Sequence, residues 1–330
     1  MSKASQKRAL KISKGTLKGY LFESILKELI KKAGFDSEFE CDQLTKDKKS
    51  FHGRGAVHQI DLSGKFCMNI PFIYPILLIG EAKSRRGKVS LADVRNFFGA
   101  VMDISQYHKI STKKSPAERY YQLSKPRYTI CPVFFSLRGF RKSAEQFMFA
   151  QGISFIIYEN NPFISQMYNN IEHLIKHVNF DKLTKEDEKK FRDFNLFKKI
   201  NPSCRKERFD EFLTKLEKQL DRIRSFVGML NGRYTVNIIS KNNKLVSYTG
   251  KIRLKRIAEN ILELRTKDNK LLGVFSLSKH FINYVLKKNE YYENSFSFLD
   301  IIINRRGMIK IARLEIEKSA KEKLKEINHK

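Results

Sequence analysis

The stretch Pro75-Ile-Leu-Leu-Ile-Gly-Glu81-Ala82-Lys83 decides the fold that we expect for this chain. The apolar run between Pro75 and Gly80 predicts a buried strand over Ile76–Lys83. Side chains alternate along a strand, so Glu81 and Lys83 are expected to project from the same face. Charged groups at the end of a buried strand need a partner, because burying an unpaired charge costs free energy.

A second acid lies upstream, in Gln59-Ile60-Asp61. We expect Val57–Phe66 to form the preceding strand, with Asp61 inside it. Asp61 and Glu81 together predict a Mg²⁺ site, because Mg²⁺ prefers carboxylate oxygens and retains several waters; Mn²⁺ is expected to substitute. One of those waters could supply a nucleophile at a phosphate. Lys83 could then position that water or stabilise the developing negative charge.

The pattern acid-x-Lys is weak by itself, because it also occurs at four other places in the chain. These matches are Asp47-x-Lys49, Asp187-x-Lys189, Glu188-x-Lys190 and Asp268-x-Lys270. All four lie in stretches that predict polar loops or charged helices. Only Glu81-Ala82-Lys83 follows a buried strand and has an acid in the strand before it. The competing interpretation of this group is an ordinary salt bridge between strand ends.

The surrounding sequence predicts an α/β unit with the order helix, three strands, helix, strand, helix, strand. Apolar residues recur at helical spacing from Leu21 to Ala33, and Gly34 is the expected stop. Ser90 is a plausible N-cap for the next helix, with Asp93 three residues later. The remaining elements are a short strand in 35–42, a strand over Tyr128–Ser136 in which Pro132 indicates an edge or a bulge, a helix over Phe140–Gln151 and a strand over Ile153–Tyr158.

Residues 15–158 resemble the PD-(D/E)xK nuclease superfamily and, within it, the Mrr-like restriction endonucleases. The segments that carry the resemblance are Gly53–Asp61, Glu81-Ala-Lys83, the helix around Val94–Asp103, Phe135-Ser136 leading to Gly139-Phe140, and Gly152-Ile153. The resemblance implies an α/β restriction-endonuclease-like core, a mixed central sheet flanked by helices. It also implies that Glu23 completes the metal site from the first helix, although a solvated helix edge explains Glu23 as well. Ile60 stands where the family usually has proline.

The charge balance favours a polyanionic partner, and we expect double-stranded DNA. The chain has 65 Lys plus Arg against 35 Asp plus Glu, a formal net charge of +30. The candidates for contact with DNA are Arg54, Gln59, Arg85, Arg86 and Lys88. Each candidate has another interpretation. Arg54 could lie in a tight turn, Gln59 could be a strand residue whose hydrogen bonds are satisfied, and the charges over 85–88 could simply be solvated. The sequence has no apolar run that could span a bilayer and no secretory signal, so we expect a cytoplasmic protein without a membrane partner.

Asn160-Asn161-Pro162 is the expected boundary between a nuclease domain, 1–160, and an α+β domain, 161–330, that recognises DNA or forms a homodimer. Charged helices are expected to about Met229, including one over Arg208–Leu230 with an apolar stripe. Three hairpins are then predicted, Arg233–Ile239 with Lys244–Tyr248, Ile261–Arg265 with Leu271–Leu277, and Phe296–Asn304 with Met308–Glu315, followed by a charged C-terminal helix.

The function that these features predict is a Mg²⁺-dependent endodeoxyribonuclease of a restriction system. Asp61 and Glu81 would bind the metal, Lys83 would assist the water and Glu23 would support the site. Two alternatives remain open. One is a junction-resolving or repair nuclease on the same core, and the other is a DNA-binding protein without enzymatic activity, whose charged cluster is only structural.

Overall fold

A computed structural model describes residues 12–45, 50–107, 127–191, 193–241, 243–279, 282, 297–305 and 308–316. Its centre is a mixed five-stranded sheet with the strand order β1-β4-β5-β6-β7. The strands are β1 (Phe35–Asp36), β4 (Leu62–Phe66), β5 (Ile76–Lys83), β6 (Thr129–Ser136) and β7 (Ser154–Ile157). Strands β5, β6 and β7 are parallel to one another, whereas β1 and β4 run antiparallel to their neighbours. The apolar run therefore forms the central strand β5, as its sequence predicts.

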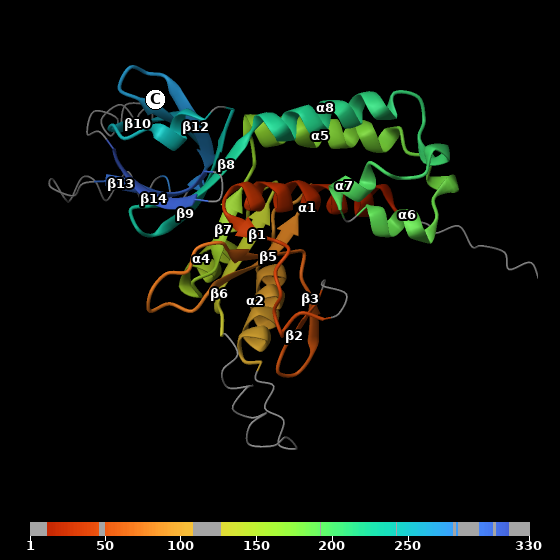
Figure 1. The fold of residues 1–330 in the computed structure, drawn as a ribbon, viewed down its shortest axis with the longest axis horizontal. Coiled ribbons are helices and arrows are strands. Elements are labelled where there is room, and N and C mark those ends of the chain that lie inside the picture. Colours follow the sequence, from red (N-terminus) through yellow and green to blue (C-terminus); the bar gives the residue numbers. More distant parts are fainter. Residues whose placement is uncertain are drawn as a thin grey trace, which may run out of the picture.

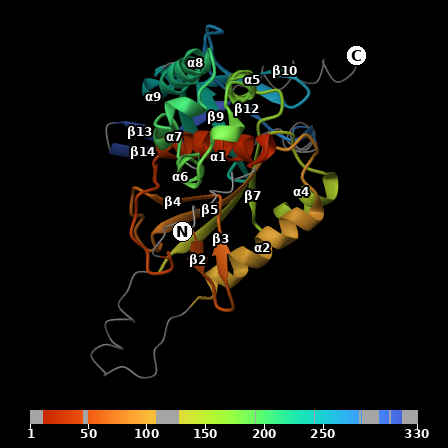
Figure 2. The same ribbon diagram turned by 90° about the vertical axis from the view of Figure 1, so that its right-hand side faces the viewer.

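Helices cover both faces of this sheet (Figures 1 and 2). Helix α1 (Lys14–Lys32) packs on one face, and helices α2 (Leu91–Ser105) and α4 (Lys142–Ala150) pack on the other. Leu78 and Ala82 of β5 belong to the buried cluster on the α1 side, whereas Leu77 and Ile79 belong to the cluster on the α2 side. Strand alternation therefore directs Glu81 and Lys83 toward α2, at the end of β5.

Helix α2 begins with a complete capping box, as the spacing of Ser90 and Asp93 predicts. The Ser90 hydroxyl accepts from the Asp93 N–H, and the Asp93 carboxylate accepts from the Ser90 N–H at 2.8 Å. These two bonds satisfy two backbone donors at the start of the helix. They also fix the position of the Asp93 carboxylate near the end of β5.

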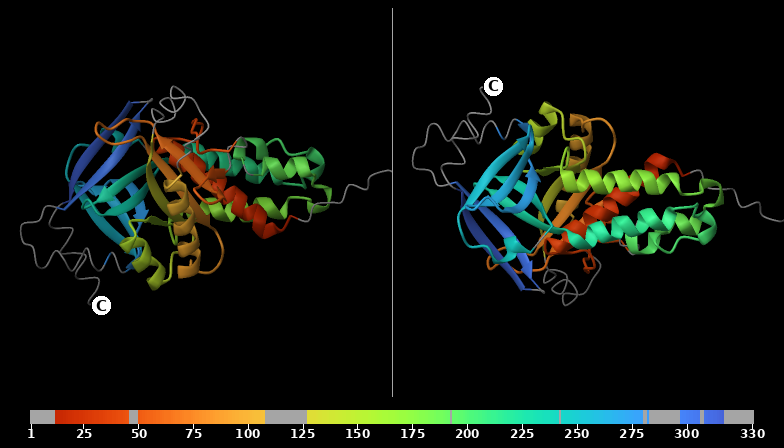
Figure 3. Two further views of the ribbon diagram at one scale, coloured as in Figure 1. Left: turned by 90° about the horizontal axis from the view of Figure 1, so that it is seen from below. Right: turned by 90° about the horizontal axis from the view of Figure 1, so that it is seen from above.

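A second helical layer follows the sheet and packs against α1. It consists of α5 (Pro162–Lys176), η1 (Phe180–Lys182), α6 (Lys185–Lys190), α7 (Phe194–Phe197), η2 (Pro202–Cys204) and α8 (Phe209–Arg222). Helices α5 and α8 lie side by side above α1 (Figures 1 and 3). One buried cluster runs from Leu17 in α1 to Leu220 in α8. Because this cluster includes residues before and after Asn160-Asn161-Pro162, hydrophobic packing continues across the expected boundary. Asn161 itself caps the start of α5.

Strands β8 to β14 form a closed barrel in the order β10-β11-β12-β9-β8-β13-β14. Their bounds are β8 (Arg224–Leu230), β9 (Tyr234–Ser240), β10 (Ile252–Ala258), β11 (Ile261–Thr266), β12 (Leu271–Ser276), β13 (Ser297–Arg305) and β14 (Met308–Ile316), with the short helix α9 (Lys244–Ser247) between β9 and β10. Ile252 pairs with Ile316 and closes the barrel. A separate apolar cluster fills its interior.

Two of the three predicted hairpins are confirmed, and one is wrong. β11 pairs with β12, and β13 pairs with β14. β9 pairs instead with β8, because Asn231 and Gly232 adopt left-handed conformations and form the turn between them. Residues 244–247, expected as a strand, form helix α9.

The helix expected over Arg208–Leu230 is therefore too long. Helix α8 ends at Arg222, and its apolar stripe includes Phe212 and Leu216, whereas β8 follows from Arg224. The charged C-terminal helix and the pattern Asp47-x-Lys49 lie outside the described residues.

The strand expected over Val57–Phe66 is interrupted at Ile60-Asp61. β3 (Val57–Gln59) pairs with β2 (Ser50–His52) in a separate two-stranded sheet, and β4 starts at Leu62 in the main sheet. Asp61 therefore occupies the bend between two strands and not a position inside one. Strand β6 has a neighbour on each side, but at Pro132 its β7 side is unpaired, so the predicted edge position of Pro132 is confirmed locally. β7 is short and pairs with β6 only from Val133 onward, so the missing N–H of Pro132 disrupts no bond to β7.

The sheet and the barrel are joined by buried hydrogen bonds. The hydroxyl of Tyr158, directly after β7, donates to Asn237 Oδ1 in β9 at 2.9 Å, and Asn237 Nδ2 donates to Ser225 Oγ in β8 at 2.8 Å. In the part of the chain that the structure describes, no helix combines the length and the apolar character needed to cross a bilayer.

Candidate active site

Asp61, Glu81 and Lys83 meet where β4 begins and β5 ends. Leu62 pairs with Gly80, and this register places Asp61 beside Glu81. The Ala82 N–H donates to Asp61 Oδ2 at 3.0 Å, which explains why β4 starts only after Asp61. Lys83 Nζ donates to Glu81 Oε1 in an ion pair in which both side chains are largely buried. The structure thus brings together the three residues that the sequence singles out as the centre of the site.

The electrostatics of this group are those of two competing carboxylates and one cation. Burial raises the pKa of Glu81, and the negative charge of Asp61 raises it further, against the opposing effect of Lys83. Burial acts to lower the pKa of Lys83, but the carboxylates of Glu81 and Asp61 outweigh it, so this pKa is raised. One ammonium group therefore does not neutralise the pair of acids, and an additional positive charge would stabilise them.

Asp93 is a fourth member of this group that the sequence analysis treats only as a capping residue. Its carboxylate adds to the rise in the pKa values of Glu81 and Lys83. It also forms an ion pair with Arg85. Burial acts to raise the pKa of Asp93, but hydrogen bonds from Ser90 and Arg85 lower it to about 2. Asp93 is thus ionised at neutral pH and adds a negative charge at the start of α2. In the sequence, the capping pattern Ser90-x-x-Asp93 shortly after Lys83 indicates that this acid lies near the end of β5.

The donors available here fit a divalent cation held by two carboxylates. In the described part of the chain, no three His, Cys, Asp or Glu side chains come close enough together to hold a metal ion. Asp61 keeps one carboxylate oxygen free of the bond from Ala82, and Glu81 keeps the oxygen that Lys83 does not bind. Mg²⁺ is commonly bound in proteins through one or two carboxylates, together with waters and substrate phosphate. Asp61 and Glu81 satisfy that requirement.

Glu23 is not brought into a metal-holding group with Asp61 and Glu81. It belongs to α1, which packs on the sheet face opposite to α2. Its Oε1 lies 3.9 Å from the position that a Cβ would occupy at Gly19, one turn earlier on its own helix. The role that the resemblance implies for Glu23 therefore has no support from this arrangement.

The three basic residues that follow Lys83 in the sequence each lie near a different acidic side chain. Arg85 is held by Asp93. Arg86 is exposed and contributes to lowering the pKa of Glu172 in α5. Lys88 is exposed and has the same kind of effect on Glu145 in α4. All three side chains are exposed, where a phosphate could reach them, but Arg85 is already paired with Asp93.

Arg54 and Gln59 lie outside the group. The loop around Arg54 is attached to the C-terminal end of α2, where Asp103 accepts from the Gly55 N–H at 2.8 Å and contacts His58 Nε2 at 2.7 Å. Asp93 and Asp103 are about 15 Å apart along the helix, at 1.5 Å per residue. Gln59 is exposed at the end of β3, in the smaller sheet. The sequence predicts Val57–Phe66 as one strand, on which Gln59 and Asp61 would share a face, but the strand ends between them, so Gln59 does not line the Asp61–Glu81 group.

Comparisons with known proteins give little further information. No family model matches the chain, and no curated protein matches it. Among solved structures, one match is entitled "Crystal Structure of Protein of Unknown Function AF1548", with 12% sequence identity and a TM-score of 0.33, over 61% of this chain and 98% of the other. A TM-score of 0.33 does not establish a shared fold. The candidate site therefore depends on the residues and their geometry.

Proposed function

We propose that this protein is a divalent-metal-dependent endodeoxyribonuclease that hydrolyses phosphodiester bonds of double-stranded DNA. The observation that carries the proposal is the pairing of Asp61 and Glu81 at the end of a buried strand, where Lys83 offsets them in part. Asp61 and burial together raise the pKa of Glu81, so a divalent cation would relieve an existing repulsion. The net charge of +30 supports a polyanionic substrate.

Each residue then has a distinct role in the proposed reaction. Asp61 and Glu81 would hold Mg²⁺, or Mn²⁺ in its place, which supplies a water of lowered pKa and neutralises charge at the phosphate. Asp61 is oriented for this role by the Ala82 N–H, and Glu81 by Lys83. The Lys83 ammonium, kept protonated by its raised pKa, would stabilise the negative charge that develops on the phosphate oxygens.

The test is cleavage of supercoiled plasmid with Mg²⁺ and with EDTA. The unchanged protein should nick or linearise the plasmid only with Mg²⁺, and Glu81→Gln and Asp61→Asn should lower the rate by about 10³-fold. Asp268→Asn is the matched control, because Asp268-x-Lys270 has the same pattern on an exposed turn between β11 and β12. Equal cleavage by Glu81→Gln and Asp268→Asn would reject the assignment.

The choice between a restriction enzyme and a repair or junction-resolving enzyme concerns the substrate. We place the protein in a cytoplasmic restriction system, because plain duplex DNA satisfies the charge argument without a special structure. Rates on plain duplex, methylated duplex and a four-way junction of equal length separate these cases. A preference of 100-fold or more for the junction would favour the resolving enzyme.

One observation favours a second candidate, a DNA-binding protein without enzymatic activity. Asp61 already accepts a backbone N–H, and Glu81 already has an ion-pair partner, so both carboxylates contribute to the local structure. In that case Asp61→Ala, which removes the acceptor of the Ala82 N–H, would destabilise the end of the sheet, and no metal-dependent cleavage would be seen. Tight plasmid binding without any nicking in Mg²⁺ or Mn²⁺ would establish this alternative.

A further inference from the structure

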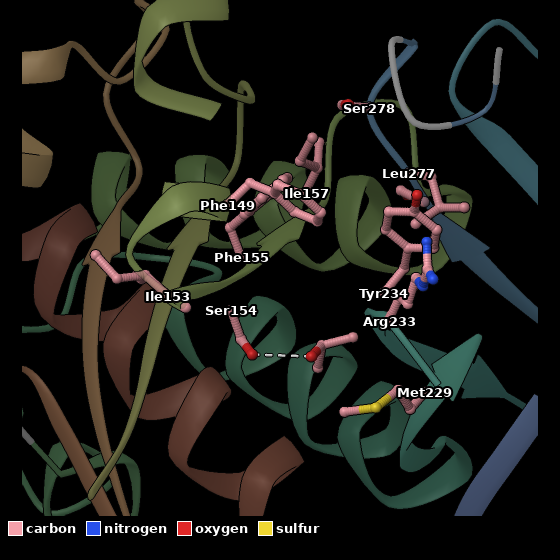
Figure 4. A pocket seen from close by; sticks show the side chains of 13 residues that line it. Phe149, Ile153, Ser154, Phe155, Ile157, Met229, Arg233, Tyr234, Leu277 and Ser278 are labelled. Carbon is pink, nitrogen blue, oxygen red and sulfur yellow. Dashed lines mark hydrogen bonds between the residues drawn. The ribbon is translucent and has the colours of Figure 1, made fainter. Parts of the chain in front are cut away.

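A cavity of about 220 Å³ lies between the sheet and the barrel, apart from the Asp61–Glu81 group. One wall comes from α4 and β7, and the other comes from β8, β9 and β12 (Figure 4). Apolar side chains form most of it, including Ile153, Phe155 and Leu277. No acidic residue lines it among those that the structure describes. A cavity of this size, between apolar walls, suits a small planar molecule or one fragment of a larger one.

Two aromatic rings lie nearly parallel at this cavity. The centroids of Phe149 and Tyr234 are 6.3 Å apart, and the planes of the rings differ by 20°. Tyr234 is buried, whereas 54% of Phe149 is exposed. An exposed phenylalanine in a folded protein loses the stabilisation that its burial would give. Exposed aromatic rings of this kind are the surfaces on which nucleic-acid bases stack.

The cavity also contains polar groups that could bind the edge of a heterocycle. Ser276 Oγ is buried and has no hydrogen-bond partner, and the residue is 7% exposed. Such a group costs free energy unless a ligand or water satisfies it. Ser154 Oγ and Thr235 Oγ1, which also line the cavity, lie 2.8 Å apart in a hydrogen bond, drawn as a dashed line in Figure 4.

Arg233 provides a positive charge at the same cavity. It directly follows the turn between β8 and β9, in which Asn231 and Gly232 have positive φ. Asn231 is bonded to β13, because its N–H donates to the Phe298 carbonyl at 2.9 Å and its Oδ1 accepts from the Phe298 N–H at 3.1 Å. The backbone that carries Arg233 is therefore held in place, and an arginine so placed can bind a phosphate adjoining a bound base.

We propose that this cavity binds a single unstacked base of a nucleic-acid strand. The exposed ring of Phe149, backed by the buried ring of Tyr234, would stack on the base. Ser276 would hydrogen-bond to the edge of the base, and Arg233 would contact the neighbouring phosphate. A base must leave its stack to be bound in this way, which costs least in single-stranded DNA or at a mismatch. The inference rests on the proposed function only for the nature of the polymer, and it needs neither the metal nor hydrolysis.

The absence of tryptophan from the chain allows a direct test. Phe149→Trp places a single fluorophore at the cavity, and Phe72→Trp places one on an exposed residue outside it. Both variants are titrated in EDTA, on the Glu81→Gln background, with a short single-stranded oligonucleotide. We expect saturable quenching in Phe149→Trp, little change in Phe72→Trp, and little change in either variant with an abasic oligonucleotide of equal charge. Equal quenching by the abasic strand would overturn the proposal.

A second measurement leaves Phe149 unchanged. An oligonucleotide with one 2-aminopurine should lose emission when it binds the otherwise unaltered protein, because stacking quenches this base. Phe149→Ala should weaken binding by about 5- to 150-fold, the usual effect of losing one stacking partner. Ser276→Ala should weaken it less and change the preference among bases. Binding with unchanged emission, or equal affinity in Phe149→Ala, would show that the cavity is only part of the joint between sheet and barrel.

The two proposals fail in different ways. Base-dependent quenching by a protein that never cleaves plasmid would keep the base site and reject the nuclease. Metal-dependent cleavage by a protein that shows no quenching would keep the nuclease and reject the base site.

Discussion

Glu81 and Asp187 are two largely buried carboxylates with the same local pattern, acid-x-Lys, and opposite surroundings. Asp187 lies in α6 with 1% of the residue exposed. It accepts from Thr184 Oγ1 at 2.8 Å and from the N–H groups of Thr184 and Asn201, each at 3.2 Å. Each acid has an ion-pair partner, Lys190 for Asp187 at 3.7 Å and Lys83 for Glu81, but only Glu81 of the two faces a second acid, Asp61.

The pKa values of the two groups move in opposite directions for this reason. Burial acts to raise the pKa of Asp187, but the bonds from Thr184 and Asn201 outweigh it, so the pKa is lowered. Burial and Asp61 raise the pKa of Glu81. A buried acid whose oxygens are satisfied stabilises the fold, whereas a buried acid that faces a like charge destabilises it. The second arrangement is typical of functional sites.

The largest expected effect is that two substitutions separate activity from stability. Glu81→Gln should lower the cleavage rate by about 10³-fold, with a free energy of unfolding that is unchanged or higher, because a repulsive charge is removed. Asp187→Asn should lower the free energy of unfolding by about 1–3 kcal/mol, because buried donors lose their acceptor, with an unchanged rate per folded molecule. Urea unfolding and plasmid cleavage on the same preparations measure both quantities. A loss of stability in Glu81→Gln equal to that in Asp187→Asn would make Glu81 structural.

The next effect concerns the cation between the two acids. Lys83→Ala should lower the single-turnover rate by about 10²-fold, the usual effect of removing one preorganised charged group. Lys83→Arg should restore little of it, because a planar guanidinium does not replace a compact ammonium. Lys189→Ala, in the pattern around Asp187, is the matched control and should leave the rate unchanged. Near-normal rates in both Lys83 variants would limit Lys83 to a salt bridge.

A smaller effect is expected from pH. Because the pKa of Glu81 is raised, its contribution to stability is greatest while it is protonated and is lost as the pH rises through that pKa. Metal binding requires the ionised form, so the Mg²⁺ concentration at half-maximal cleavage should rise as the pH falls. Asp187 should show the opposite linkage, since its lowered pKa contributes stability that is lost toward acid. A Mg²⁺ requirement that does not change with pH would contradict the first expectation.

The smallest effect is expected at the start of α2. Ser90→Ala removes the capping bond to the Asp93 N–H and should cost about 1 kcal/mol. It also removes the Ser90 hydroxyl as a donor to Asp93, which keeps its bonds from the residue 90 N–H and from Arg85, so the cleavage rate should fall only a few-fold. Thermal unfolding and cleavage of Ser90→Ala, beside Ser90→Thr as a conservative control, measure the two effects. A rate loss as large as that of Lys83→Ala would place Asp93 in the reaction itself.

The sequence predicts the centre of the sheet well because local signals agree there. The apolar run before Glu81 defines β5 to the residue, and Ser90 with Asp93 defines the start of α2. Asp61 is predicted in the right place but in the wrong conformation. Its bond to the Ala82 N–H joins residues 21 positions apart and is not visible in the local pattern.

The barrel is predicted less well because its strands pair with partners distant in the sequence. β8 continues from α8 after a single residue, Ile223, and its apolar residues also fit the helical stripe of that helix. Asn231-Gly232 is a strong hairpin signal for this strand pair, but the helical spacing of the apolar residues before it obscures the first strand. The cavity between sheet and barrel could not be predicted, because its two walls come from segments that are far apart in the sequence, with Ile157 and Met229 as their nearest lining residues.

Binding of Mn²⁺ tests the central claim, that Asp61 and Glu81 form one divalent-cation site, without depending on a substrate. The free Mn²⁺ signal in electron paramagnetic resonance is followed while the metal is titrated into the unchanged protein, Glu81→Gln and Asp187→Asn. The account predicts one bound equivalent in the unchanged protein and in Asp187→Asn, and the loss of that equivalent in Glu81→Gln. Equal binding by the unchanged protein and Glu81→Gln, or no binding at millimolar Mn²⁺, would contradict it.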